Sequence, residues 1–434
     1  VFTKYIKGSG AAILNTYPIM NQKDSVKSVN PYSGQTFPAN PEYAGLKYTQ
    51  NPDKFDRTAR PASGAPKTVK APEFFQTKLK NGMKVLGTSS TESPLVNINI
   101  NFEGGSLALT PDQYKKMGIP ELTASILNEG TKNYTTEQIS AELEKLGSSI
   151  SFSGGKSQNS INVSCLKKNL DATLKLLEEK ILNPGFRPED FKLAKKQYKE
   201  SVKNDKTSPS AMANKAFNQA LYGSSSILGL DPTVKSIENI ELQDLKDYYA
   251  NCYSSSVANM VIVGNITEAE IMPKLEFINK MSNKEVNIQP IPEPAAKTEQ
   301  QFFIQDKIAA PSSVIMMGYP SLKYDATGDY FKCQIANFAF GGAFNSRLNL
   351  NLREDKGYTY GIRSGFGGGK YTGSFIISSS VKRPATVLSL AEVTKEFANY
   401  TQNGITDKEL EFTKNSMLNV EALRYESPWQ KAGF

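Results

Sequence analysis

Residues 338–361 read FAFGGAFNSRLNLNLREDKGYTYG and form the most distinctive stretch of this 434-residue chain. The glycine pair at 341–342 lacks the Gly-Lys-Ser/Thr ending of a phosphate-binding loop, so turns and close packing are its expected roles. Farther on, Arg353 lies near the end of a predicted helix, and Tyr360 follows the turn predicted at Gly357. This spacing allows the two polar side chains to converge.

The end of this stretch leads into a repeat of an earlier part of the chain. Phe152-Ser153-Gly154-Gly155-Lys156 recurs as Phe366-Gly367-Gly368-Gly369-Lys370, each followed by an alternating strand and then a helix. Beyond them, the pattern of residues 186–191 recurs at 405–410, after a five-residue shift in spacing. Two matches in the same order and at nearly the same offset predict the duplication of a unit of about 200 residues.

The order of hydrophobic patterns in the first copy indicates the fold class. Alternation and helical periodicity occur in separate runs, so antiparallel strands are followed by runs of helices. This order is typical of an α+β fold of antiparallel or mixed sheet packed with helices, rather than of alternating β/α units. The predicted strands cover 76–87, 95–102, 149–166 and 257–263, and the predicted helices cover 118–128, 135–146, 170–221 and 237–249.

Two stretches rich in proline interrupt these patterns and predict the domain boundaries. We expect a tail strand of a preceding domain at 1–17 and a long extended linker at 18–73. The first α+β unit follows at 74–270 and a second linker at 271–300. The second α+β unit, 301–434, is expected to stop short of its closing strand.

The absence of histidine narrows the possible chemistry. With 0 histidines in 434 residues, the chain has no imidazole base, no Ser-His or Cys-His nucleophile pair and no zinc site built on histidine. Ser-Lys hydrolase chemistry remains open on composition, but no motif supports it. The cysteines at 165, 252 and 333 show no C-x-x-C spacing, so core packing is their expected role.

Charge and hydropathy patterning limit the possible partners. The 51 Lys and Arg residues exceed the 43 Asp and Glu residues by a formal +8, but the basic residues are scattered, so a nucleic-acid partner is not expected. The longest apolar runs, such as residues 257–263, are far shorter than the roughly 20 residues that cross a bilayer, so no membrane span is predicted.

The stretch at 338–361 resembles the pitrilysin/insulinase family of zinc metallopeptidases. In that family a glycine is followed by Ser-Arg-Leu and then by Leu-Arg-Glu-X-X-Gly-X-X-Tyr, and here Ser346-Arg347-Leu348 and Leu352-Arg353-Glu354 stand in this pattern. The resemblance extends from about residue 74 to 434. It implies the fold of pitrilysin and of the mitochondrial processing peptidase, in which four such units form two bowl-like halves around a chamber.

The resemblance also marks where the zinc site of the family falls in this sequence. The His-X-X-Glu-His motif of the family maps onto residues 121–125, so Glu121, Ala124 and Ser125 occupy the positions of the two histidine ligands and the catalytic glutamate. Glu200 falls near the distal glutamate ligand, with a solvated helix face as its expected role. No catalytic residue and no metal ligand set are therefore expected in this chain.

The resemblance implies that this chain is the non-zinc, C-terminal half of such a metalloendopeptidase. That half closes the chamber, and its Arg353 and Tyr360 would bind the backbone of a peptide substrate, while an upstream half or separate subunit supplies Zn²⁺. A structural alternative pairs Arg353 with Glu354 or Asp355 and makes Tyr360 a strand-face aromatic. A functional alternative is an inactive scaffold or peptide-binding subunit of a larger assembly.

The start at Val1 and the resemblance to fused bacterial envelope members suggest a location in the periplasm or cell envelope.

Overall fold

The computed structural model describes residues 41, 45, 55–56, 58–59, 70–291 and 299–433. The chain separates into two compact units, Val1–Gly64 and Ala65–Phe434, and the second contains both α+β repeats. The tail strand predicted at 1–17 lies outside the described residues, as does nearly all of the linker predicted at 18–73.

The first repeat is built on a six-stranded mixed sheet with the order β1-β2-β6-β3-β5-β4. Its one parallel pair is β2 with β6, and all other neighbours are antiparallel. One face of the central strand β3 is apolar, with Val96, Ile98 and Ile100 at 0% exposure. The strands are β1 (Phe75–Lys78), β2 (Lys84–Ser89), β3 (Leu95–Glu103), β4 (Ser149–Gly154), β5 (Gln158–Leu166) and β6 (Ala258–Gly264).

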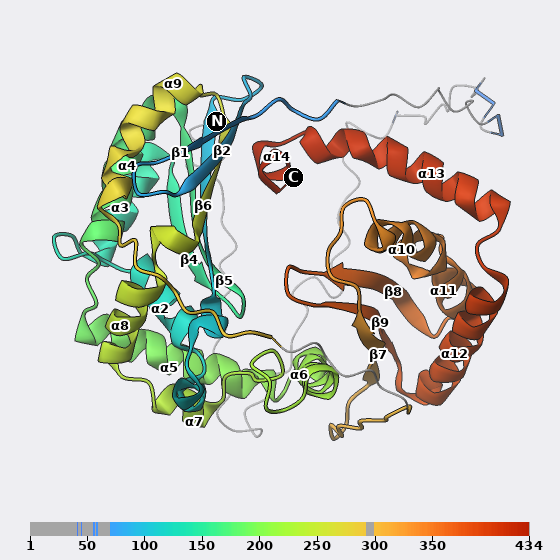
Figure 1. Cartoon of the computed structure of the whole chain (residues 1–434). Helices are drawn as coiled ribbons and strands as arrows, with labels where there is room; N and C mark the ends of the chain where they lie inside the picture. The colour runs from blue at the N-terminus through green and yellow to red at the C-terminus, as the bar shows by residue number, and fades with distance from the viewer. Residues whose placement is uncertain are drawn as a thin grey trace. The chain divides into compact units, whose positions relative to one another are not determined.

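Helices of the first repeat cover this apolar face, and Figure 1 shows α2, α3, α4 and α8 together on one side of the sheet, whereas α6 packs against β7 (Ser312–Ser321) of the second repeat. The helices of the first repeat are α2 (Ile119–Asn128), α3 (Thr136–Leu146), α4 (Leu170–Leu182), α5 (Pro188–Asp205), α6 (Pro209–Tyr222), α7 (Val234–Glu238), α8 (Leu242–Cys252) and α9 (Glu268–Ile271). A linker is expected at 271–300, but its first part is folded into the first repeat. A 3₁₀ helix at Met272–Lys280 packs Leu275 and Ile278 into the core of the first repeat.

The second repeat contains a three-stranded antiparallel sheet with the order β7-β9-β8. Phe375 and Ile377 on β9 face a small core that includes Val393 on α12. The strands are β7 (Ser312–Ser321), β8 (Thr359–Gly368) and β9 (Gly373–Lys382). The helices are α10 (Asp329–Asn337), α11 (Arg347–Asn349), α12 (Thr386–Asn403), α13 (Asp407–Glu421) and α14 (Pro428–Gly433), with π-helical segments at Phe338–Gly342 and Leu350–Asp355.

The two sheets confirm the duplication. The order β7-β9-β8 reproduces β3-β5-β4, and the hairpins share one register: Phe152 pairs with Ile161, and Phe366 pairs with Phe375. The shift in spacing between the copies lies in one helix, because α4 has 13 residues and its counterpart α12 has 18. The α+β class, with one mixed and one antiparallel sheet packed with helices, is therefore confirmed.

Within the described ranges, no helix is both long enough and apolar enough to cross a membrane.

Candidate functional site

Tyr360 is the most exposed of the large hydrophobic side chains described in the second repeat, at 99% exposure. It lies in an irregularity of β8, where Thr359 pairs with Val381 but Ile362 pairs with Ser379. Two residues of β8 therefore stand opposite one residue of β9, which is the geometry of a β-bulge. A bulge bends its strand and redirects the side chains within it, and here it directs Tyr360 away from the core.

Hydroxyl groups hold this bulge in place. The Thr359 Oγ1 accepts a hydrogen bond from the Gly361 backbone N–H at 3.1 Å, and the Ser379 Oγ lies 3.0 Å from Thr359 Oγ1 and 2.9 Å from the Gly361 carbonyl oxygen. The side chains of Thr359 and Ser379 therefore hold the bulge by hydrogen bonds. Tyr360 itself makes no such hydrogen bond.

Asn349 provides a further anchor from α11. Its Oδ1 accepts the backbone N–H of Ile362 at 3.0 Å, and its Nδ2 donates to the Ala343 carbonyl oxygen at 3.2 Å. The side chain is 2% exposed, so it satisfies a buried N–H group next to the bulge. Sequence reasoning missed Asn349, and only the pairing of Asn349 with Ile362 in space reveals its role.

Arg353 lies in the π-helical segment that precedes the turn at Gly357, where φ is +61°. Its guanidinium carbon is 4.2 Å from the centroid of the Phe344 ring, and its Nη1 lies 3.0 Å from Glu354 Oε1. The predicted pairing with Glu354 therefore occurs. No hydrogen bond joins Arg353 to Tyr360, but the segments that carry them meet through a bond from Tyr358 N–H to the Leu352 carbonyl oxygen.

The helix expected to carry the zinc motif is α2, and it packs closely against β4. A Cβ on Gly154 would lie 2.2 Å from the Pro120 carbonyl oxygen, so only glycine fits at the end of β4. On this helix Ala124 is 3% exposed and offers a methyl group alone. Ser125 is exposed, and its Oγ donates back to the Glu121 carbonyl oxygen at 3.0 Å.

Glu121 is the one acidic group at these three positions, and its surroundings favour the neutral acid. Its Oε2 is buried without a hydrogen-bond partner, and burial raises the pKa of the carboxyl, with a backbone hydrogen bond and then the Lys156 charge as smaller opposing influences. Tyr198 of α5 lies against the start of the same helix, within 2.9 Å of a Cβ placed on Gly118. Burial and the nearby Glu121 raise the pKa of Tyr198.

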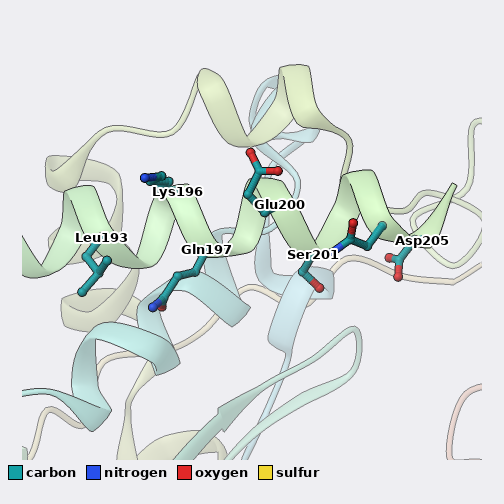
Figure 2. A pocket seen from close by; sticks show the side chains of 7 residues that line it. Leu193, Lys196, Gln197, Glu200, Ser201 and Asp205 are labelled. Carbon is teal, nitrogen blue, oxygen red and sulfur yellow. The ribbon is translucent and has the colours of Figure 1, made fainter. Parts of the chain in front are cut away.

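Glu200 does not complete a metal site. It is exposed and pairs with Lys203 at 2.7 Å, as expected for a solvated helix face. Figure 2 shows Glu200 beside an open groove of about 500 Å³ along α5, where Leu193, Gln197, Ser201 and Asp205 also lie. Across the described ranges, no group of three or more His, Cys, Asp or Glu side chains could hold a metal ion. The residues at the motif therefore do not fit the zinc ion of the family.

The buried carboxyl leads to a prediction about stability. Because burial raises the folded-state pKa of Glu121, the folded chain binds more protons than the unfolded chain above about pH 4.5, and stability falls as the pH rises through the folded pKa. Glu121→Gln is therefore expected to raise the free energy of unfolding by about 1 kcal/mol at pH 7 and to change it little below pH 4. Urea unfolding at both pH values measures the difference.

Glu200→Gln is the matched control, because this carboxylate is exposed, and it is expected to have little effect at either pH. A stability gain for Glu121→Gln that persists unchanged at pH 4 would contradict the argument.

Comparison with known proteins identifies the family. Residues 84–228 match the family described as "Insulinase (Peptidase family M16)", and residues 239–417 match "Peptidase M16 inactive domain". The non-peptidase homolog YmxG of Helicobacter pylori is 25% identical over 338 residues, which cover 77% of this chain and 76% of that protein.

Two solved structures share the fold. The peptidase M16 inactive domain from Pseudomonas fluorescens superposes with a TM-score of 0.72 at 24% identity, covering 80% of this chain and 84% of that one. The periplasmic protease PqqL from Escherichia coli gives 0.69 at 14% identity, covering 90% of this chain but 44% of that one. The chain belongs to the insulinase-type family of peptidases, peptidase family M16, and its residues 239–417 match the inactive domain of that family.

Proposed function

We propose that this chain binds unfolded peptides as the non-zinc half of a peptidase M16 metalloendopeptidase, while a partner carries the zinc site. The observation that carries the proposal is the presentation of Tyr360. A fully exposed aromatic side chain on a bulge fixed by Thr359, Ser379 and Asn349 has no role in packing. Such a constructed bulge is typical of a residue that meets a ligand.

The chemistry of the pair suits a peptide backbone. The Tyr360 hydroxyl can donate to a carbonyl oxygen, and the Arg353 guanidinium offers a charged donor that stacking on Phe344 holds in one orientation. Neither group carries out a chemical step in this proposal. They bind and orient the peptide, and the partner performs the cleavage.

The proposal also concerns how the zinc-bearing partner is joined to this chain. The chain covers 76% of the Helicobacter pylori homolog but 44% of PqqL, so PqqL extends well beyond the part that resembles this chain. The zinc-bearing partner is either a half joined upstream in a precursor or a separate subunit. We also propose the cell envelope as the location, supported by the periplasmic assignment of PqqL, and fractionation of source cells tests it.

The scaffold alternative is favoured by one observation, the engagement of Arg353 with Glu354. A scaffold subunit would need neither an accessible Arg353 nor Tyr360, so it predicts that substitutions at both positions leave peptide binding unchanged.

Tyr360→Ala and Arg353→Ala are expected to weaken peptide binding by about tenfold each, since each removes a hydrogen-bond donor from the site. The measurement is fluorescence anisotropy of a labelled unstructured peptide titrated with the chain. Tyr134→Ala and Arg383→Ala are matched controls, because Tyr134 is also an exposed tyrosine and Arg383 an exposed arginine. Unchanged affinity in both variants would favour the scaffold.

Cleavage provides the second readout. A quenched-fluorescent peptide with zinc is expected to remain intact with this chain alone and to be cleaved faster when a zinc-bearing family member from the same source is added. Cleavage by this chain alone would overturn the proposal.

A further inference from the structure

The helical layer of the first repeat contains a pocket of about 400 Å³ that the proposed function does not use. Its walls come from the end of α4, the turn after α4, the loop after α2, and α8. The pocket is here named the α4–α8 pocket. Its lining residues are Lys132, Leu182, Pro184, Gly185, Phe186, Lys246 and Tyr249.

Most of the α4–α8 pocket is apolar. The rings of Phe186 and Tyr249 have their centroids 5.7 Å apart and are tilted by 59°. The hydroxyl of Tyr249 already donates to the Ile181 carbonyl oxygen, so the polar end of that ring is satisfied within the fold. Together with Leu182 and Pro184, the two rings offer a ligand an aromatic and aliphatic surface.

Both charged groups of the pocket are cations. Lys132 and Lys246 are exposed, no described acid pairs with either ammonium, and none of the other lining residues is acidic. Glu179, in the last turn of α4, already accepts hydrogen bonds from Asn133 Nδ2 and Asn183 Nδ2, each at 2.9 Å. Two unpaired cations beside an apolar surface favour an anionic ligand that carries an apolar body.

The turn after α4 adds backbone donors to the two ammonium groups. Phe186 has a φ of +44°, in the left-handed region that costs a non-glycine residue about 1–2 kcal/mol. The backbone N–H groups of Gly185 and Phe186 have no acceptor among the described residues, so both remain free to bind a ligand. Successive N–H groups around a left-handed residue are a recurrent arrangement for binding anions. The strained turn therefore favours the same class of ligand as the two lysines.

Hydrogen bonds join this turn to the loop that carries Lys132. The Lys132 backbone N–H donates to the Asn183 carbonyl oxygen at 2.8 Å. From the other end of the turn, Arg187 Nη2 donates to the carbonyl oxygens of Thr131 and Tyr134, at 2.6 and 2.8 Å. The walls of the pocket are thus held in place without a ligand, which lowers the ordering cost of binding.

We infer that the α4–α8 pocket binds a small organic carboxylate, with its apolar body against the two rings and its charged group at the two lysines. Two sources offer this chemistry: a free acid, and the terminal carboxylate of a peptide that ends in an apolar residue. The pocket includes neither Arg353 nor Tyr360, so this binding is separate from the peptide binding proposed above.

The test titrates the full chain with phenylacetate and follows binding by isothermal titration calorimetry. Phenylacetamide lacks the charge and acetate lacks the apolar body, so phenylacetate is expected to bind about tenfold more tightly than either. A short Gly/Ser peptide that ends in Phe, with its carboxylate free or amidated, distinguishes the two sources. If the free-carboxylate peptide binds more tightly than phenylacetate, the ligand is a chain end, and the reverse order indicates a free acid.

Two lysine variants locate the binding. Lys132→Met and Lys246→Met keep most of the aliphatic side chain and remove the charge, and each is expected to weaken phenylacetate binding about tenfold. Both are expected to keep the Tm of wild type, because each ammonium is exposed and unpaired. Lys175→Met is the matched control, because Lys175 is an exposed lysine of α4 that does not line the pocket. It is expected to leave phenylacetate binding unchanged.

Three results would overturn the inference. They are equal affinity of wild type for phenylacetate and phenylacetamide, no binding of phenylacetate at all, and wild-type affinity for phenylacetate in both Lys132→Met and Lys246→Met. Each of them would leave the proposed function standing, because that function is tested by the substitutions at Arg353 and Tyr360.

Discussion

The Arg347→Ala variant is expected to lower the free energy of unfolding by about 3 kcal/mol. Arg347 begins α11, and its Nε and Nη2 donate to the two carboxylate oxygens of Glu409 on α13 at 2.6 and 2.7 Å. Its guanidinium carbon also lies 4.7 Å from the centroid of the Tyr400 ring. The two charged side chains are only 18% and 25% exposed, so water screens the pair little. Alanine would leave the Glu409 carboxylate largely buried without its cation.

The same ion pair is expected to make the free energy of unfolding fall at acid pH. Hydrogen bonds, chiefly those from Arg347 and also those from Thr406, lower the pKa of Glu409 to about 2, against an ordinary value of 4.5. A lowered folded-state pKa gives stability that is complete above pH 4.5 and is lost as the pH falls toward 2. Wild type is therefore expected to lose about 3 kcal/mol over this range through Glu409, and Arg347→Ala should show a much smaller loss.

Urea unfolding followed by circular dichroism at pH 7 and at pH 3 measures both effects. Arg383→Ala is the control, because Arg383 is an exposed arginine of the same repeat. Equal midpoints for Arg347→Ala and wild type at pH 7 would show that the pair contributes nothing measurable.

The role of Arg347 illustrates what the sequence could and could not predict. The Ser346-Arg347-Leu348 motif carried the resemblance, and the repeated hairpin fixed the duplication and the α+β class, because strand register depends on local spacing. The partner of Arg347 lies 62 residues away, however, in a helix whose orientation depends on packing. Residue types along the chain do not specify that contact.

The candidate site, too, could be predicted from the sequence only in part. The sequence shows the spacing of Arg353 and Tyr360. The bulge that exposes Tyr360, however, depends on how β8 pairs with β9, which the sequence does not show. Likewise, Gly365 and Gly368 are indistinguishable in sequence. Only the atoms that would meet a Cβ separate a glycine that packing requires from one that it does not.

The second large expected effect is that of Lys180 on the free energy of unfolding at alkaline pH. This lysine on α4 is 2% exposed, and its ammonium donates to the Asn128 and Glu129 carbonyl oxygens at the end of α2, at 3.1 and 2.8 Å. Burial lowers its pKa from 10.5 to about 8. Between these values the unfolded chain binds more protons than the folded chain, so this group makes stability rise as the pH rises.

The stability of wild type relative to Lys180→Met is therefore expected to increase by about 3 kcal/mol between pH 7 and pH 10.5. The comparison must be made as a difference, because burial raises the pKa of Cys165 to about 11, and this opposite effect is common to both proteins. Urea midpoints across the pH range provide the measurement, with Lys175→Met, an exposed position on the same helix, as the control. A difference that does not change with pH would mean that the ammonium is as well solvated in the folded chain as in water. In that case the two carbonyl oxygens at the end of α2 fully offset its burial.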